Sequence, residues 1–212
     1  MKYDVDVQNR IFDFCYMNAL RDATLQLAFS GKTKDIAESE DVKELVKEYA
    51  RSLAGITKPI QDDNYIYNLI DLITNMAPQS HDKENRIVMF KYGNAQKLVN
   101  MTAKYLFIRN YSKMEYIELF KKCHCPMDSL IIKAMKKDIK IRSDLDKSIK
   151  AIYDGIYDKE NTNTWREYLD LPWSLCSEER YRFFQTVINK IIENKYNNEI
   201  SPLEYDYLMW NP

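Results

Sequence analysis

Glycine is scarce in this chain, and that scarcity constrains the fold more than any other feature of the sequence. Only 4 of the 212 residues are glycine, at positions 31, 55, 93 and 155, whereas average usage of about 7% would give about fifteen. Sandwiches, doubly wound sheets and propellers need glycine at many turns, and phosphate-binding loops need several glycines close together. The sequence therefore excludes P-loop and dinucleotide-binding folds and favours an all-α protein.

Apolar residues recur at spacings of three and four along most of the chain, as in helices that bury one face. This pattern predicts about eight to ten helices in a single all-α domain over residues 1–212, compact and with a boundary between two lobes near residues 80–93. The expected helices cover residues 5–29, 40–54, about 60–76, 94–109 and 111–120. Further helices are expected to begin near Asp128, to run through Ile149, Ile152 and Ile156, and to begin at Ser177 and at Pro202. Residues 79–88 and 159–164 are polar and are expected to be loops.

The sequence favours a cytoplasmic protein that contacts no membrane. No segment approaches the 18–20 apolar residues of a membrane span, and the first six residues lack the apolar stretch of a secretory signal. The 4 cysteines are too few for a disulfide framework in a chain of this size. No cofactor is expected.

The near-neutral net charge of −1 hides an uneven distribution of charge along the chain. From Asp82 to Lys150 there are 16 Lys and Arg against 8 Asp and Glu, and the rest of the chain has 15 against 24. A basic segment of this kind is typical of a phosphate-binding surface, whose affinity falls steeply as salt rises. The alternative is a set of solvated helix faces that acidic neighbours balance in space.

Gly93 stands directly before a predicted helix, in the segment 92–97 (YGNAQK). A glycine at this point allows a tight entry and leaves the first backbone amides of the helix open, and such amides can hold a phosphate. Lys97, one turn into the helix, would contact that phosphate or act as an amine nucleophile if it is desolvated. An ordinary helix start with a surface lysine explains the same residues.

Asp128 follows Pro126 at the start of another predicted helix. An aspartate at this position is the most ordinary N-cap. The functional alternative is a carboxylate fixed at a helix start and directed toward a cleft, where it would stabilise a developing cation or orient a water molecule as general base.

Cys123, His124 and Cys125 place two thiols and an imidazole in three consecutive residues, which are ligand types that zinc prefers. Structural zinc sites, however, usually space their cysteines by two to four residues and gather four ligands. Buried thiols beside a helix start are the alternative. We expect no metal here, although the sequence leaves the question open.

Residues 90–135 resemble the catalytic stretch of helix-hairpin-helix DNA glycosylases, an all-α superfamily. The resemblance rests on the segment 93–97 (GNAQK) followed by 125–128 (CPMD). It looks closest to small bacterial proteins with an 8-oxoguanine-glycosylase-like fold, some of which are encoded among antiviral defence genes. In this superfamily a lysine lies just inside the helix after the hairpin, and an aspartate follows a proline-containing segment at a later helix start. Lys97 and Asp128 match these two positions.

The resemblance implies an enzyme that flips a damaged base out of DNA into an aromatic-lined pocket. Lys97, made neutral by burial, would attack the sugar carbon as the base departs. Asp128 would stabilise the cationic sugar in the transition state. The residues expected to contact the nucleic acid are Lys91, Gly93, Asn94, Lys133, Lys136 and Lys137.

A competing interpretation is a non-enzymatic helical module that binds another protein, such as a subunit of a phage or of a bacterial defence system. It needs no special residues and is compatible with a surface rich in tyrosine and methionine. The sequence does not identify a lesion, a pathway or an oligomeric state.

The two interpretations differ in what happens when Lys97 and Asp128 are replaced. If the protein is a glycosylase that acts through an amine, borohydride should trap a covalent DNA intermediate, and Lys97→Gln should abolish trapping because only an amine forms the reducible Schiff base. Asp128→Asn should slow base release while leaving binding nearly intact. Melting temperatures measured in parallel separate these effects from misfolding. Wild-type protein that traps on no lesion, with both variants melting like wild type, would remove the catalytic pair from consideration.

Overall fold

The computed structural model describes residues 5–24, 39–60, 62–78, 80–81, 85, 87–110, 118–156 and 165–210. These residues form nine α-helices, one 3-10 helix and one pair of two-residue strands, which confirms the expected all-α fold with eight to ten helices. The chain divides into two compact units, Met1–Cys123 and His124–Pro212. The division thus falls at Cys123, whereas the sequence placed a lobe boundary near residues 80–93.

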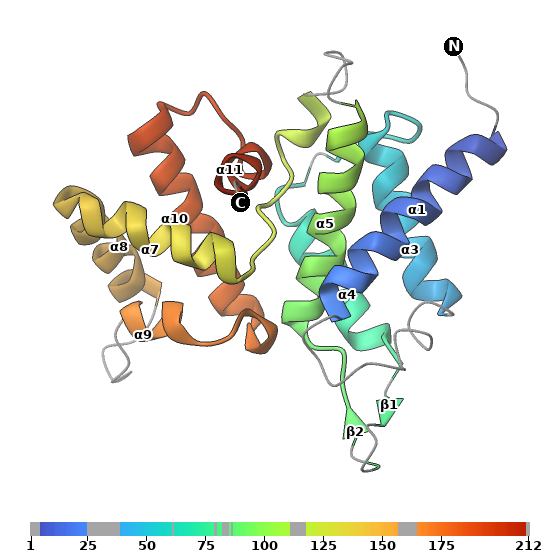
Figure 1. The fold of residues 1–212 in the computed structure, drawn as a ribbon, viewed down its shortest axis with the longest axis horizontal. Helices are drawn as coiled ribbons and strands as arrows, with labels where there is room; N and C mark the ends of the chain where they lie inside the picture. The colour runs from blue at the N-terminus through green and yellow to red at the C-terminus, as the bar shows by residue number, and fades with distance from the viewer. Residues whose placement is uncertain are drawn as a thin grey trace. The chain divides into compact units, whose positions relative to one another are not determined.

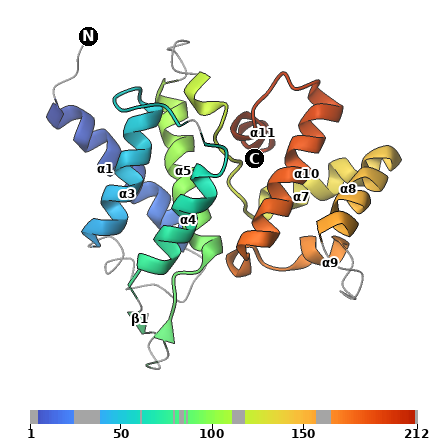
Figure 2. The same ribbon diagram turned by 180° about the vertical axis from the view of Figure 1, so that it is seen from behind.

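The first unit is a bundle of four described helices, α1 (Val5–Thr24), α3 (Glu40–Leu53), α4 (Tyr65–Met76) and α5 (Tyr92–Asn110), as Figures 1 and 2 show. Residues 25–29 and 111–117, where the sequence also predicted helix, lie outside the described residues. Helix α4 begins at Tyr65, later than the expected residue 60. Among the described residues, no helix has both the length and the apolar character needed to cross a bilayer.

Helix α5 is the centre of this bundle, because α1, α3 and α4 all pack against it. Every residue from Tyr92 to Lys104 is buried, although the sequence pattern predicts burial of one face alone. Three neighbouring helices leave little of its circumference to water, so polar side chains on the other face are buried as well. Among them, Asn94 donates a hydrogen bond of 2.8 Å to the Ala23 carbonyl and so joins α5 to α1.

The connection from α4 to α5 contains the two strands, β1 (Ser80–His81) and β2 (Ile87–Val88). They pair in antiparallel fashion, with Ser80 opposite Val88 and His81 opposite Ile87. The sequence predicted a polar loop over residues 79–88. This short ladder lies inside the first unit.

The second unit contains α7 (Ser129–Ile141), α8 (Ser143–Ile156), α9 (Trp165–Asp170), the 3-10 helix η1 (Trp173–Leu175), α10 (Glu178–Tyr196) and α11 (Pro202–Met209). Helix α10 packs against α7, α8 and α11. Ser177 caps α10 through a hydrogen bond from the Arg180 amide. Ser201 and Glu204 form a reciprocal capping box at the start of α11, with proline at its first position. Both helix starts are as the sequence predicts.

Arg180 holds the irregular segment between α9 and α10 in place. Its guanidinium donates to the carbonyls of Tyr168 at 2.7 Å, Pro172 at 3.0 Å and Leu171. The same group lies 4.8 Å from the centre of the Phe184 ring. Because the side chain is buried, these three carbonyls have little access to water as a replacement partner.

Replacing Arg180 with lysine should therefore destabilise the protein by about 2–4 kcal/mol, because one ammonium cannot reproduce a planar fork that serves three carbonyls. Arg182→Lys is a matched control on the same helix, since Arg182 forms a partly exposed ion pair with Glu178 and its replacement should cost less than about 0.5 kcal/mol. Urea denaturation of both variants measures the difference. Equal costs would show that the three carbonyl contacts contribute nothing specific.

Candidate functional site

Lys97 is a buried residue of the central helix of the first unit. It is 9% exposed, and Lys104, two turns further along α5, is 4% exposed. The spacing of seven residues places both lysines on one face of the helix. Neither side chain therefore adds charge to the surface, although the sequence counted both in its basic segment.

The start of α5 differs from the expected phosphate-binding entry. The helix begins at Tyr92, so Gly93 lies within its first turn and not ahead of it. The amides of Asn94 and Ala95 donate to the Lys91 carbonyl at 2.9 and 3.0 Å, so these two amides are not open to a phosphate. Asn94 is also fully buried, and its side chain accepts from the Lys91 amide at 3.2 Å. Lys91 itself is exposed. Phosphate contacts by Lys91, Gly93 and Asn94 stay predictions.

Asp128 is the N-cap of α7. Its Oδ1 accepts hydrogen bonds from the amides of Leu130 at 2.9 Å and Ile131 at 3.0 Å, which is the capping role that the sequence allowed. Asp128 belongs to the second unit and Lys97 to the first. Their cooperation as a catalytic pair stays a prediction.

Cys123 and Cys125 are buried and form hydrogen bonds with residues of α3 and α10. The Tyr49 hydroxyl lies 3.4 Å from the Cys123 sulfur, and burial raises the pKa of this thiol to about 12. The Gln185 side chain accepts from the Cys125 amide at 3.0 Å and donates to the Cys125 carbonyl at 2.8 Å. No group of three or more metal-ligand side chains occurs among the described residues. Cys123 and Cys125 are buried free thiols.

His124 is held in its neutral form. Its Nδ1 lies 3.1 Å from the Tyr181 hydroxyl, in a hydrogen bond whose direction depends on the tautomer. Burial and, to a smaller extent, the nearby charge of Arg182 lower the pKa of His124 from 6.5 to about 3. An imidazole with this pKa is not a general acid or base at neutral pH.

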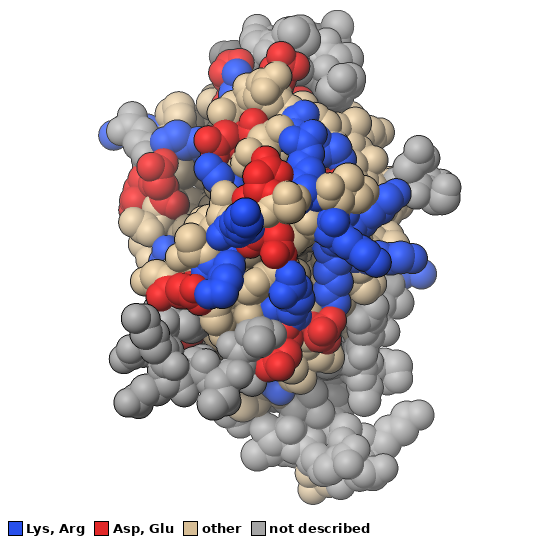
Figure 3. Space-filling view, turned by 90° about the vertical axis from the view of Figure 1, so that its left-hand side faces the viewer, with Lys and Arg blue, Asp and Glu red and all other residues tan. Residues whose placement is uncertain are grey.

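The second unit carries a row of lysines on α7. At about 100° per residue, Lys133, Lys136, Lys137 and Lys140 fall within an arc of about 100°, which we call the lysine face. Lys136 pairs with Asp170. The other three are exposed, and they form no ion pair among the described residues. Figure 3 shows one face of the molecule, on which Lys and Arg side chains gather in several groups with Asp and Glu between them.

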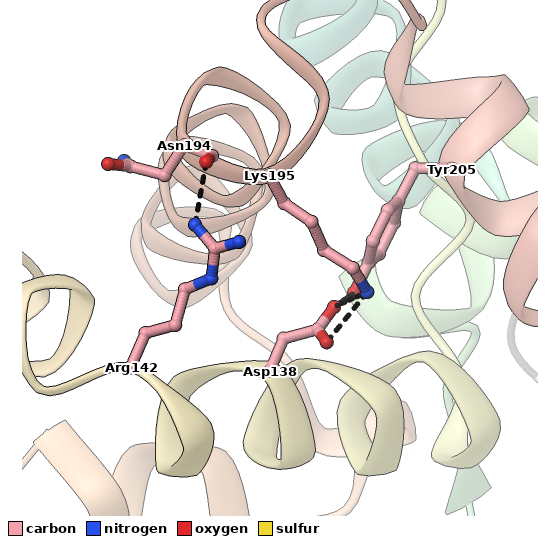
Figure 4. Close-up of polar contacts among 5 residues, drawn as sticks. All are labelled: Asp138, Arg142, Asn194, Lys195 and Tyr205. Atoms are coloured by element: carbon pink, nitrogen blue, oxygen red, sulfur yellow. Dashed lines mark hydrogen bonds and ion pairs between the residues drawn. The ribbon is translucent and has the colours of Figure 1, made fainter.

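Beside the lysine face, Asp138 ties α7 to two other helices, as Figure 4 shows. Its carboxylate accepts from the Lys195 amine of α10 at 2.9 and 3.1 Å and from the Tyr205 hydroxyl of α11 at 3.1 Å. Burial and then the charge of Asp138 raise the pKa of the Tyr205 hydroxyl. Burial lowers the pKa of Lys195, but its hydrogen bonds to Asp138 and Tyr196 and the charge of Asp138 outweigh this effect, so the pKa is raised. Tyr205 therefore donates and Lys195 stays charged at neutral pH.

These three helices line a groove of about 790 Å³, which we call the α7 groove. Its lining residues are Leu130, Lys133, Ala134, Lys137, Asp138, Ile141, Arg142, Lys195 and Met209. Sequence reasoning identified Lys133 and Lys137 but not the rest. The recurrence of residues 130, 134, 137 and 141 at helical spacing was an available signal, but the partners from α10 and α11 meet α7 only in the folded chain.

Comparison with known proteins does not identify the function of this chain. No protein family, curated protein or solved structure matches this chain. The resemblance to helix-hairpin-helix glycosylases is therefore neither supported nor contradicted by a relative, and it stays an expectation based on residues 90–135.

The neutral, buried His124 should make the protein less stable in mild acid. The pKa of His124 is about 3 in the folded protein against a usual 6.5. Between these two pH values, His124 is protonated in the unfolded chain but stays neutral in the folded protein. Stability is complete above pH 6.5 and falls as the pH drops, by about 2 kcal/mol at pH 5. Urea denaturation at pH 7.5 and pH 5 measures this loss. His124→Gln should remove most of it and His81→Gln should not, whereas equal pH dependence in all three proteins would contradict the buried neutral state.

Proposed function

We propose that this protein binds nucleic acid through the lysine face of α7. The observation that carries the proposal is the exposure of Lys133, Lys137 and Lys140, which have no carboxylate partner among the described residues. Exposed basic side chains in a row are the groups that contact phosphates and release counterions on binding.

The spacing of the lysine face suits a phosphate backbone. Lys133 and Lys140 are seven residues apart, or about 10 Å along the helix axis. One strand of B-DNA advances about 3.4 Å per nucleotide, so the row spans about three nucleotide steps. Such contacts would position the protein on the backbone without reading the sequence of bases.

Other lysines of the chain contrast with this row. Lys121, Lys122 and Lys150 each pair with a carboxylate, on Glu118, Asp63 and Asp154 respectively. A paired lysine must give up its partner to contact a phosphate, whereas the three unpaired lysines of α7 give up only water and counterions. This difference supports α7 as the contact surface over these three paired lysines.

Base excision on the bound nucleic acid is a second, narrower proposal. The feature that supports it is the position of Lys97, a buried amine where the resembling family carries its attacking lysine. Borohydride trapping with Lys97→Gln decides this proposal separately from binding.

The binding proposal predicts a loss of affinity when Lys133, Lys137 and Lys140 are replaced together by glutamine. Fluorescence anisotropy with labelled duplex DNA, measured at several salt concentrations, should show weaker binding. The slope of log affinity against log salt should fall by about 2–3, since each phosphate contact contributes about 0.9.

The matched control replaces Lys121, Lys122 and Lys150 by glutamine, which changes the net charge by the same amount at exposed, paired positions. This control should keep most of the affinity and of the slope. An equal loss in both triple variants would mean that only net charge matters, and wild-type protein that fails to bind DNA at low salt would refute the proposal outright.

A further inference from the structure

We infer that the α7 groove docks an acidic amphipathic helix of a partner protein, and that this helix competes with nucleic acid for Lys133 and Lys137. The docking step stands on the geometry of the groove alone, whereas the competition rests on the proposed nucleic-acid binding. The occupant is identified by the apolar wall of the groove, by the charges on its rim and by its length.

The apolar wall is the first observation. Leu130 and Ile141, at the two ends of α7, are 50% and 69% exposed, and both line the groove together with Ala134 and Met209. A phosphate backbone gains nothing from leucine and isoleucine, whereas a helix with apolar residues at spacings of three and four would bury them. The wall therefore favours a protein occupant over nucleic acid.

The charged residues that line the groove indicate the charge of the partner. Lys133, Lys137, Arg142 and Lys195 line the groove against a single carboxylate, Asp138. That carboxylate is already occupied by Lys195 and Tyr205. Arg142 donates one hydrogen bond of 2.7 Å to the Asn194 carbonyl, which leaves its positive charge without a carboxylate partner in the groove. Two lysines and one arginine remain uncompensated beside the apolar wall, so the complementary surface is acidic.

The length of the groove fits a helix of ordinary size. Leu130 and Ile141 are eleven residues apart, which is about 16 Å along α7 and equals about three turns of a partner helix. A partner with apolar anchors at i, i+4, i+7 and i+11 would match this wall, with Asp or Glu flanking the anchors.

A second hollow of about 610 Å³, on the side of α7 that faces α8 and α9, gives a useful contrast. Lys136 and Arg166 both line it, and each is paired with a carboxylate that also lines it, Asp170 and Asp146. Lys140 lines this hollow as well and forms no ion pair among the described residues, so one cation is uncompensated here. The α7 groove has three such cations, and charge complementarity therefore favours the groove for an acidic partner.

The test uses the full chain and a designed probe, since the natural partner is not identified. The probe is a fluorescent helical peptide of about 18 residues, because shorter peptides rarely hold a helix alone. It carries leucines at i, i+4, i+7 and i+11, flanked by glutamates. A peptide of the same composition in scrambled order is its control, and binding is followed by fluorescence anisotropy.

We expect the designed peptide to bind at least about tenfold more tightly than the scrambled one, because only ordered leucines can bury the wall. The double variant Leu130→Ser, Ile141→Ser should weaken binding about tenfold. Leu171→Ser with Leu175→Ser is the matched control, because these leucines are 49% and 54% exposed outside the groove, and it should leave affinity unchanged. Circular dichroism melting confirms that both variants fold.

Equal affinity for the two peptides, or equal loss in the two double variants, would overturn docking in the groove. Unlabelled duplex DNA should displace the designed peptide, and simultaneous binding of both would overturn the competition. Peptide binding without any DNA binding would leave the docking site standing and refute the proposed function. DNA binding without peptide binding would support the proposed function and overturn docking in the α7 groove.

Discussion

The surface of the second unit depends on one carboxylate. Asp138 lies on α7, accepts two hydrogen bonds from Lys195 of α10, and accepts a third from Tyr205 of α11. Its side chain is only 11% exposed, and a carboxylate with so little access to water is stable only when it is paired and hydrogen-bonded. Its three contacts come from two different helices, so Asp138 helps to fix the rotation of α7 about its own axis, together with the buried Ile131, Met135 and Ile139. This rotation decides which side chains α7 presents to water.

That rotation has two consequences for function. Ile131, Met135 and Ile139 are buried, so the four lysines of the lysine face lie on the opposite, exposed side of α7. Asp138 itself stands at the edge between these two sides, where the wall of the groove also lies. A single helix thereby presents a cationic row and an apolar stripe next to each other, and Lys133 and Lys137 belong to both.

The first unit shows why a buried lysine is hard to recognise from sequence. The pattern around Lys97 and Lys104 is that of a helix with one apolar face, and surface lysines would be normal on its other face. The structure buries both lysines because α1, α3 and α4 surround α5. Burial of a helix on all sides depends on how many other helices pack against it. The spacing of apolar residues within the helix does not reveal how many such helices there are.

The sequence by itself determined what depends on neighbours along the chain. Scarce glycine and spacings of three and four gave the all-α class, and local capping residues gave the starts of α7, α10 and α11 at Asp128, Ser177 and Ser201. Only the tertiary structure decided the division at Cys123, the burial of Lys97, and the meeting of Asp138 with Lys195 and Tyr205. The physical reason is that caps and helical periodicity are interactions between residues a few positions apart. The groove, by contrast, requires side chains 57 and 67 positions apart to meet Asp138, and such contacts are fixed only when the whole unit packs.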